Sequence, residues 1–129
     1  MNIEELFAFL INEYKLTYRY QAFYNCYGGN WMVDTHSFFN ESGCFTIQII
    51  FQREINFWYS SQFSTEMEEL CESGINVSLT EPQIWAKHEK LLFFKNPFFW
   101  DNYDKVLIAL AEVIKTHLEK NNEFFGIQV

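Results

Sequence analysis

The stretch that decides the fold is CFTIQIIFQREINFWY, residues 44–59. Its aromatic and aliphatic side chains recur at every second position on both sides of the polar triplet Gln52–Glu54. A period of two points successive side chains to opposite faces of a sheet. We therefore predict two strands joined in a β-hairpin, with Phe51 paired with Ile55.

Two further strands are expected before this hairpin. Residues 16–26 alternate in the same way and end at Gly28–Gly29, a two-residue turn of the kind that hairpins favour. The next strand ends at Glu41–Gly43, which fits a three-residue turn with Gly43 in the left-handed conformation. The three turns together predict a four-stranded antiparallel β-meander.

The turns also predict the register of the strands. They pair Tyr24 with Val33 and Phe39 with Phe45. On that register, one inner face collects apolar side chains from all four strands. Three turns that agree on one face are typical of a well-specified fold.

Helical periodicity lies on both sides of the meander. Residues 2–14 place apolar side chains on one stripe, with two glutamates in the first turn, where carboxylates complement the helix dipole. Residues 101–121 carry the strongest helical stripe of the chain. Residues 64–73 predict a short acidic helix, opened by a capping box that begins at Thr65.

The segment between the later helices carries weaker signals. Residues 75–80 fit a short fifth strand, and Pro82 suits the first turn of a helix that reaches Leu92. With 129 residues, the chain is expected to fold as one α+β domain spanning residues 1–129. That domain comprises an N-terminal helix, the four-stranded antiparallel β-meander, and two or three later helices, with the long C-terminal helix packed on the inner face of the sheet.

The net charge of the chain bears on its solubility and on the partners it can bind. Nine lysines and arginines stand against 17 acidic side chains, which gives a net charge of -8. This field repels phosphate backbones and anionic lipid, so we expect neither nucleic acid nor a membrane surface as a partner. No stretch reaches the ~18 apolar residues that a membrane-spanning helix needs. Solubility alone also explains an acidic composition.

Cysteine usage and the N-terminus indicate the cytoplasm. Cys26, Cys44 and Cys71 are odd in number, widely spaced and without a histidine at metal-ligand spacing, so we expect neither a disulfide framework nor a metal site. The first residues carry acids within their apolar run and lack a basic start, unlike a signal peptide. We expect a reduced, cytoplasmic protein without a cofactor.

The predicted register places a mixed polar and aromatic set on the outer face of the sheet. Such a set is poor solvent-facing surface and good recognition surface. We therefore predict partner contacts from Gln21, Asp34, His36, Gln48, Asn56 and Trp58. The alternative is that the later helices cover this face and bury these side chains as a second core layer.

A second candidate for partner binding is the acidic run within residues 64–73. It comprises Glu66, Glu68, Glu69 and Glu72. A solvated helix face explains many such runs. The sharper hypothesis is that these carboxylates attract and bind lysine and arginine side chains of a basic protein.

Catalytic signals are weak. Gly-rich phosphate loops and a Gly-x-Ser-x-Gly motif do not occur. Asp34 and His36 lie two residues apart on one strand, but the candidate nucleophile Cys26 points to the other face in the predicted register. We predict no catalytic residue and no enzyme. The alternative is a small-molecule-binding or enzymatic α+β domain with an aromatic-lined pocket around His36 and Asp34.

In its size, acidity, free cysteines, ring-rich surface and lack of a catalytic motif, the chain resembles the small immunity proteins with which bacteria neutralise toxins. The resemblance implies a cytoplasmic, non-enzymatic inhibitor that occupies the active surface of a basic toxin. A nuclease toxin fits, because its cleft must be basic to hold nucleic acid. A third hypothesis is a subunit of a larger assembly, which a large apolar interface would reveal.

Overall fold

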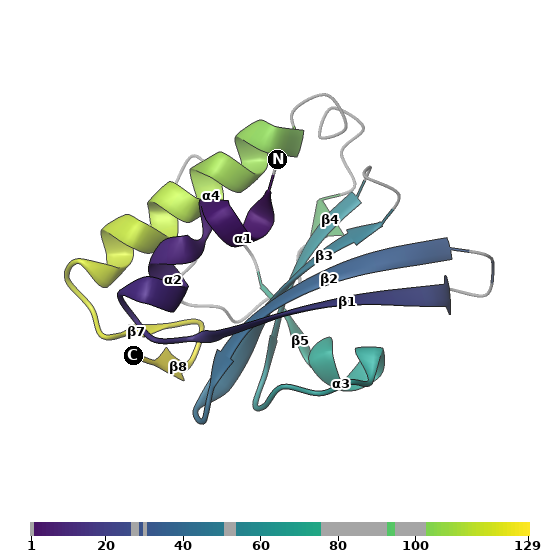
Figure 1. Cartoon of the computed structure of the whole chain (residues 1–129), viewed down its shortest axis with the longest axis horizontal. Coiled ribbons are helices and arrows are strands. Elements are labelled where there is room, and N and C mark those ends of the chain that lie inside the picture. The colour runs from purple at the N-terminus through teal and green to yellow at the C-terminus, as the bar shows by residue number, and fades with distance from the viewer. Residues whose placement is uncertain (1, 27–28, 30, 51–53, 76–92, 95–102) are drawn as a thin grey trace.

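The computed structural model describes residues 2–26, 29, 31–50, 54–75, 93–94 and 103–129. Within them, an antiparallel sheet follows the chain in the order β1-β2-β3-β4-β5 (Figure 1). Its strands are β1 (Thr17–Cys26), β2 (Trp31–Asn40), β3 (Gly43–Ile50), β4 (Glu54–Ser60) and β5 (Ser73–Gly74). The short strand β6 (Phe93–Phe94) also pairs with β4. The prediction of an α+β fold with an antiparallel meander is confirmed, and the sheet extends beyond four strands.

Helices cover one face of this sheet, as Figure 1 shows. They are α1 (Ile3–Leu6), α2 (Ala8–Asn12) and α4 (Tyr103–Leu118), and α4 is followed by the hairpin of β7 (Glu123–Phe124) and β8 (Ile127–Gln128). The short helix α3 (Met67–Leu70) lies on the other side of the sheet. The sheet therefore has a helix-covered face and an α3 face.

The core lies between the sheet and the helices α1, α2 and α4. Its fully buried side chains come from the N-terminal helices, the sheet, α4 and the C-terminal hairpin, and include Phe7, Leu10, Phe38, Phe45, Ile47, Leu107, Leu110, Ile114, Phe124 and Phe125. The ring centroids of Phe45 and Phe125 lie 5.2 Å apart. Full burial of an apolar side chain of this size stabilises the fold by about 1.5–3 kcal/mol. The apolar stripe of α4 thus holds that helix against the sheet.

The N-terminal helix differs from the continuous helix expected over residues 2–14. Asn2 caps it, because its Oδ1 accepts a hydrogen bond from the backbone N of Glu5 at 3.1 Å. The helix breaks at Phe7 into α1 and α2. Phe7 is fully buried, and its ring centroid lies 5.6 Å from that of Phe38. Tertiary packing of this ring overrides local helix propensity.

The helix expected over residues 101–121 corresponds to α4, which is 16 residues long. Beyond its end, Nδ2 of Asn121 donates a hydrogen bond to the carbonyl of His117 over 3.0 Å. The same carbonyl accepts the backbone N–H groups of Lys120 and Asn121, each at 3.1 Å, so turn-type hydrogen bonds close the end of the helix. Asp101 and Asn102, the expected cap, lie outside the described residues.

The first hairpin departs from the predicted register through a β-bulge. Cys26 pairs with Trp31, as the glycine turn implies. The pairing then shifts by one residue, and Phe23 instead of Tyr24 faces Val33. A bulge adds one unpaired residue to one strand and changes the register beyond it.

The second turn is one residue shorter than predicted. Asn40 pairs with Gly43, which leaves Glu41 and Ser42 as the loop. Oδ1 of Asn40 accepts hydrogen bonds from N and Oγ of Ser42, at 2.8 and 2.6 Å, and this local bonding favours the tighter turn. Gly43 does not adopt the left-handed backbone expected of it. It provides space instead, because a Cβ there would lie 2.9 Å from Cε1 of Tyr59.

These changes place each side chain of β2 on the face opposite to the one predicted. Asp34 and His36 lie on the helix-covered face, and Thr35 lies on the α3 face. A slip of one residue moves every side chain of a strand to the opposite face. The prediction that Asp34 and His36 share a surface with Gln48 is therefore wrong.

The third hairpin keeps the predicted faces with a different pairing. Ile55 pairs with Ile49 instead of Phe51. A difference of two residues leaves every side chain of β4 on the face predicted for it. The turn itself, residues 51–53, lies outside the described part of the chain.

The acidic stretch 64–73 contains less helix than expected. Glu66, and not Thr65, occupies the N-cap position of α3, without a side-chain capping bond. After β5, the backbone N of Ile75 donates to the carbonyl of Phe57 over 2.8 Å. The rest of the strand predicted at 75–80, and the helix predicted from Pro82 to Leu92, lie outside the described residues.

Candidate functional site

The α3 face of the sheet is polar and nevertheless buried. The register aligns Gln21, Thr35, Gln48 and Asn56 in one row across β1 to β4. Thr35 and Gln48 are fully buried, and Asn56 is 2% exposed. Buried polar groups need hydrogen-bond partners, because an unpaired one costs about 1–3 kcal/mol.

Gln48 is the centre of this polar row. Its Oε1 accepts hydrogen bonds from Nδ2 of Asn56 at 3.1 Å and from Nε1 of Trp58 at 2.9 Å. Its Nε2 donates to Sγ of Cys71 over 3.6 Å. Gln48 therefore ties β4 and the segment after β4 to the middle of the sheet.

The segment that covers this face is Ser61–Ile75, which we call the covering segment. Gln21 donates through Nε2 to the carbonyl of Ser64 over 3.2 Å. The ring of Phe63 stacks on that of Phe39, with centroids 4.3 Å apart. Together with the bond from Gln48 to Cys71, these contacts attach the covering segment to β1, β2 and β3.

Three of the predicted partner-binding residues consequently lie inside the protein. Gln48, Asn56 and Trp58 are at most 9% exposed, so the expectation that they form an open recognition surface is wrong. The predicted alternative, burial as a second layer, describes them better. Their cover is the covering segment, which contains α3, the short helix predicted within residues 64–73. Gln21, at the edge of the layer, stays partly exposed.

Asp34 and His36 form a separate cluster with two tyrosines on the helix-covered face. The hydroxyl of Tyr20 donates to Oδ1 of Asp34, and the hydroxyl of Tyr18 lies 2.8 Å from Nδ1 of His36. The rings of Tyr20 and His36 have centroids 5.2 Å apart. Tyr18 and Tyr20 were not predicted as polar partners. Their spacing of two residues on one strand puts both on the same face, and this pattern could have indicated them.

The titration behaviour of this cluster follows from its burial. Burial lowers the pKa of His36 to about 4, against an opposing effect of the Asp34 carboxylate. The pKa of Tyr18 rises to about 12, chiefly through burial, and that of Tyr20 rises to about 12, chiefly through its hydrogen bond to Asp34. At neutral pH the imidazole is therefore uncharged and both phenols are protonated.

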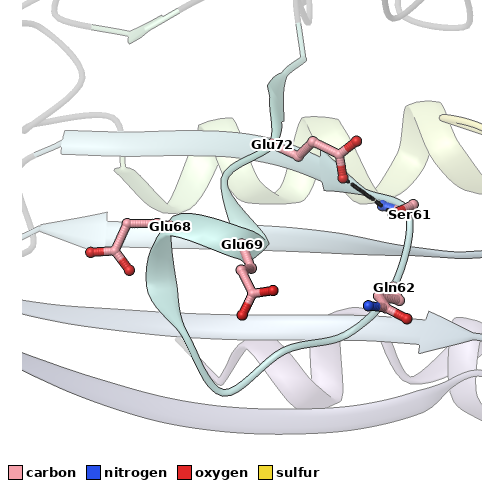
Figure 2. Close-up of a pocket in the computed structure, with 5 residues that line it drawn as sticks. All are labelled: Ser61, Gln62, Glu68, Glu69 and Glu72. Atoms are coloured by element: carbon pink, nitrogen blue, oxygen red, sulfur yellow. Dashed lines mark hydrogen bonds between the residues drawn. The ribbon is translucent and has the colours of Figure 1, made fainter.

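The outer side of the covering segment is acidic and faces solvent. All four glutamates of the predicted run, Glu66, Glu68, Glu69 and Glu72, are exposed. A pocket of about 250 Å³ lies among them (Figure 2), lined by Ser61, Gln62, Glu68, Glu69 and Glu72. The structure thus adds Ser61 and Gln62, which no sequence pattern singles out, to the predicted acidic residues.

Hydrogen bonds hold part of this acidic surface in place. Oε2 of Glu72 accepts bonds from N and Oγ of Ser61, at 3.0 and 3.3 Å. Oε1 of Glu69 accepts a bond from Oγ of Ser64 at 2.9 Å. Figure 2 shows the carboxylate of Glu72 turned toward Ser61. The carboxylates of Glu68 and Glu69 are directed away from Ser61. The negative charge is therefore spread over the surface of the segment.

The sequence around the covering segment contains no compensating positive charge. No lysine or arginine occurs between Arg53 and Lys87. A surface with one sign of charge attracts ions and side chains of the opposite sign and raises their association rate. The covering segment therefore carries four exposed glutamates and no lysine or arginine of its own.

The described residues give little support for metal or thiol chemistry. No group of three or more His, Cys, Asp and Glu side chains among them is arranged to hold a metal ion. Cys26, Cys44 and Cys71 are free. Burial raises the pKa of each thiol, to about 12 for Cys71. Such a thiol is protonated at neutral pH and is a poor nucleophile.

No protein-family model, curated protein or solved structure matches this chain. Within the described ranges, no helix has both the length and the apolar composition to cross a membrane. Two parts of the molecule are candidates for function, the covering segment and the tyrosine cluster around Asp34.

Proposed function

We propose that the chain is a non-enzymatic protein-binding domain that binds a basic protein through the acidic residues of its covering segment. The observation that carries the proposal is the exposure of Glu66, Glu68, Glu69 and Glu72 on a segment that is itself fastened to the sheet. Contact groups that are held in place before binding lose less conformational entropy when the partner docks.

The buried polar row supports this role because it limits the freedom of the covering segment. Gln48 bonds to Cys71, five residues after Glu66, and Gln21 bonds to Ser64, two residues before it. Exposed ion pairs contribute only about 0.2–1 kcal/mol each. The four carboxylates would therefore supply steering and selectivity for a basic partner, with further affinity from the surrounding contacts.

We further propose that the partner is a toxin and that the chain is its cytoplasmic, immunity-type inhibitor in a bacterium. The acidity and small size of the chain support this reading, and its free cysteines suit a reducing compartment. A nuclease is the class of toxin that fits best, because its nucleic-acid cleft is basic. An acidic inhibitor seated there would exclude the substrate.

The test uses two variants with the same change in charge. The first carries Glu66→Gln, Glu68→Gln, Glu69→Gln and Glu72→Gln. The control carries Glu5→Gln, Glu13→Gln, Glu112→Gln and Glu119→Gln, which are also exposed but belong to the helix-covered side. Glutamine keeps an oxygen that accepts the bonds from Ser61 and Ser64.

The chain and both variants serve as bait in an extract of the source organism, and the captured protein is identified by mass spectrometry.

The association rate of the purified pair is then measured from about 50 mM to about 500 mM NaCl. We expect a basic partner, a rate that falls about tenfold over this range, and an affinity that falls about tenfold in the first variant only. Inhibition of the partner's activity identifies it as a toxin. A rate independent of salt, or equal affinities of the two variants, contradicts the proposal.

The alternative function is small-molecule binding or catalysis around His36 and Asp34. The observation in its favour is the pair of hydrogen bonds that hold these two side chains to Tyr18 and Tyr20. A screen of small polar molecules, followed through the ring resonances of His36, tests it. A molecule that shifts these resonances and binds more weakly to the Asp34→Asn chain would favour the alternative.

A further inference from the structure

The β1–β2 hairpin exposes large side chains on the helix-covered side of the sheet. Tyr20 is 51% exposed, Tyr24 is 68% exposed and Met32 is 37% exposed. Alternation puts Tyr20 and Met32 on the same face as His36, and Tyr24, inside the bulge, lies close enough to Tyr20 for its charge to raise the pKa of Tyr20. In Figure 1 the end of β1 and the start of β2 extend away from α1, α2 and α4.

Carboxylates give this surface a negative character. Asp34 lies among the exposed side chains, and its Oδ1 accepts the hydrogen bond from Tyr20. The acidic side chains that act on the tyrosine cluster are Glu4, next to Tyr18, and Asp34, next to Tyr20. The basic residue of β1, Arg19, alternates onto the α3 face, and β2 contains no lysine or arginine.

Exposed phenol rings beside a carboxylate are complementary to the guanidinium group of an arginine side chain. A guanidinium stacks on the face of an aromatic ring and bonds to a carboxylate through its planar fork. Tyr20 uses Oδ1 of Asp34, and a carboxylate has a second oxygen that accepts hydrogen bonds. Tyrosine and methionine are also enriched in the cores of protein interfaces.

We propose that the surface formed by Tyr20, Tyr24, Met32 and Asp34, here called the tyrosine surface, is a second docking surface that binds an arginine side chain of the basic partner. This inference rests on the proposed function and specifies the chemistry of its partner. The tyrosine surface and the covering segment lie on opposite faces of β1. β1 is the end strand of the sheet path, so a partner seated on that edge reaches both.

The test uses defined probes, since it needs no identified partner. Capped nona-arginine, nona-lysine and a neutral glycine–serine peptide of the same length are titrated into the full chain, and the tyrosine ring resonances are followed by NMR. Tyr24→Leu removes one exposed ring, Tyr24→Phe keeps the ring without its hydroxyl, and Asp34→Asn removes the carboxylate charge. The Glu66, Glu68, Glu69 and Glu72→Gln chain tests the covering segment separately.

We expect the arginine peptide to shift the rings of Tyr20 and Tyr24 and to bind more tightly than the lysine peptide. Tyr24→Leu and Asp34→Asn should each weaken arginine-peptide binding about fivefold, and Tyr24→Phe should leave it unchanged. Unshifted rings, with binding lost only in the covering-segment variant, would overturn this inference and leave the proposed function standing. If another part of the chain covers the rings of Tyr20 and Tyr24, so that no peptide can reach them, the inference is overturned as well. Binding lost only in the Tyr24→Leu and Asp34→Asn chains would support the tyrosine surface and count against the covering segment.

Discussion

Nε1 of Trp58 donates a hydrogen bond to Oε1 of Gln48 over 2.9 Å, diagonally across β3 and β4. Asn56 donates to the same oxygen, and all three side chains are buried. The acceptor is shared, so its removal affects two donors at once. The network can therefore be tested by a single substitution at Gln48.

Gln48→Met keeps the length of the side chain and removes its polar atoms. We expect the free energy of unfolding to fall by about 2–4 kcal/mol, because the donors of Trp58 and Asn56 lose a buried acceptor. Urea unfolding followed by tryptophan fluorescence measures the change. Gln128→Met, at an exposed position, is the matched control and should stay within about 0.5 kcal/mol of the parent chain. Equal stability of the two variants would count against the buried network.

Gly43→Ala tests the close approach of Tyr59. The added Cβ would lie 2.9 Å from Cε1 of the ring, and a Cβ at Gly126 would lie 3.1 Å from the same atom. We expect a loss of about 1–3 kcal/mol in the free energy of unfolding, since the ring has little room to withdraw. In a Tyr59→Leu chain, the same alanine should cost at least about 0.5 kcal/mol less. A double-mutant cycle by chemical unfolding gives the coupling, and strictly additive losses would show that another group is the obstacle.

The pKa of His36 makes stability depend on pH in a defined window. Burial lowers this pKa from 6.5 to about 4. Between these values the unfolded chain binds a proton that the folded chain does not, so stability is complete above pH 6.5 and falls toward pH 4. The fall should amount to about 2–3 kcal/mol and should be smaller in a His36→Gln chain. Urea unfolding across this range measures it. A His36 ring that titrates in the folded protein near 6.5 by NMR would exclude the effect.

The thiol of Cys71 should be unreactive in the folded chain. Burial raises its pKa to about 12, and its Sγ accepts a hydrogen bond from Gln48. At about pH 8 the thiolate fraction is then on the order of 10⁻⁴, so alkylation should be at least about 100-fold slower than in the urea-unfolded chain. Mass spectrometry after timed treatment with iodoacetamide gives both rates. Comparable rates in the two states would mean that the covering segment opens readily.

Alternation predicts the side-chain faces of β1, β3 and β4, because a single apolar period runs through each strand. The face of β2 depends on one residue of loop length, and the bonds between Asn40 and Ser42 favour the shorter turn. No local pattern distinguishes the two turns. The misplacement of Asp34 and His36 follows from that difference together with the bulge in the first hairpin.

Burial of Gln48 is a different case, because its side-chain face was predicted and its burial under a cover was predicted only as an alternative. The cover depends on long-range contacts, such as the stacking of Phe63 on Phe39 and the bond from Gln21 to Ser64. These join residues far apart in the chain and leave no periodic signal. The exposure of the acidic glutamates, in contrast, follows from their composition and was predicted.

The covering segment has one side fastened to the sheet and one side open to solvent, and this division constrains how the protein can evolve. The amide of Gln48, the indole of Trp58 and the thiol of Cys71 depend on one another, so substitutions among them have to be concerted. The outward glutamates depend on no such neighbours in the sheet and can be replaced one at a time. Descendants that meet new partners are expected to retain the inner set and diversify the outer one. Distant homologues would then share the polar residues beneath the covering segment. The acidic residues on its outer side would differ among them.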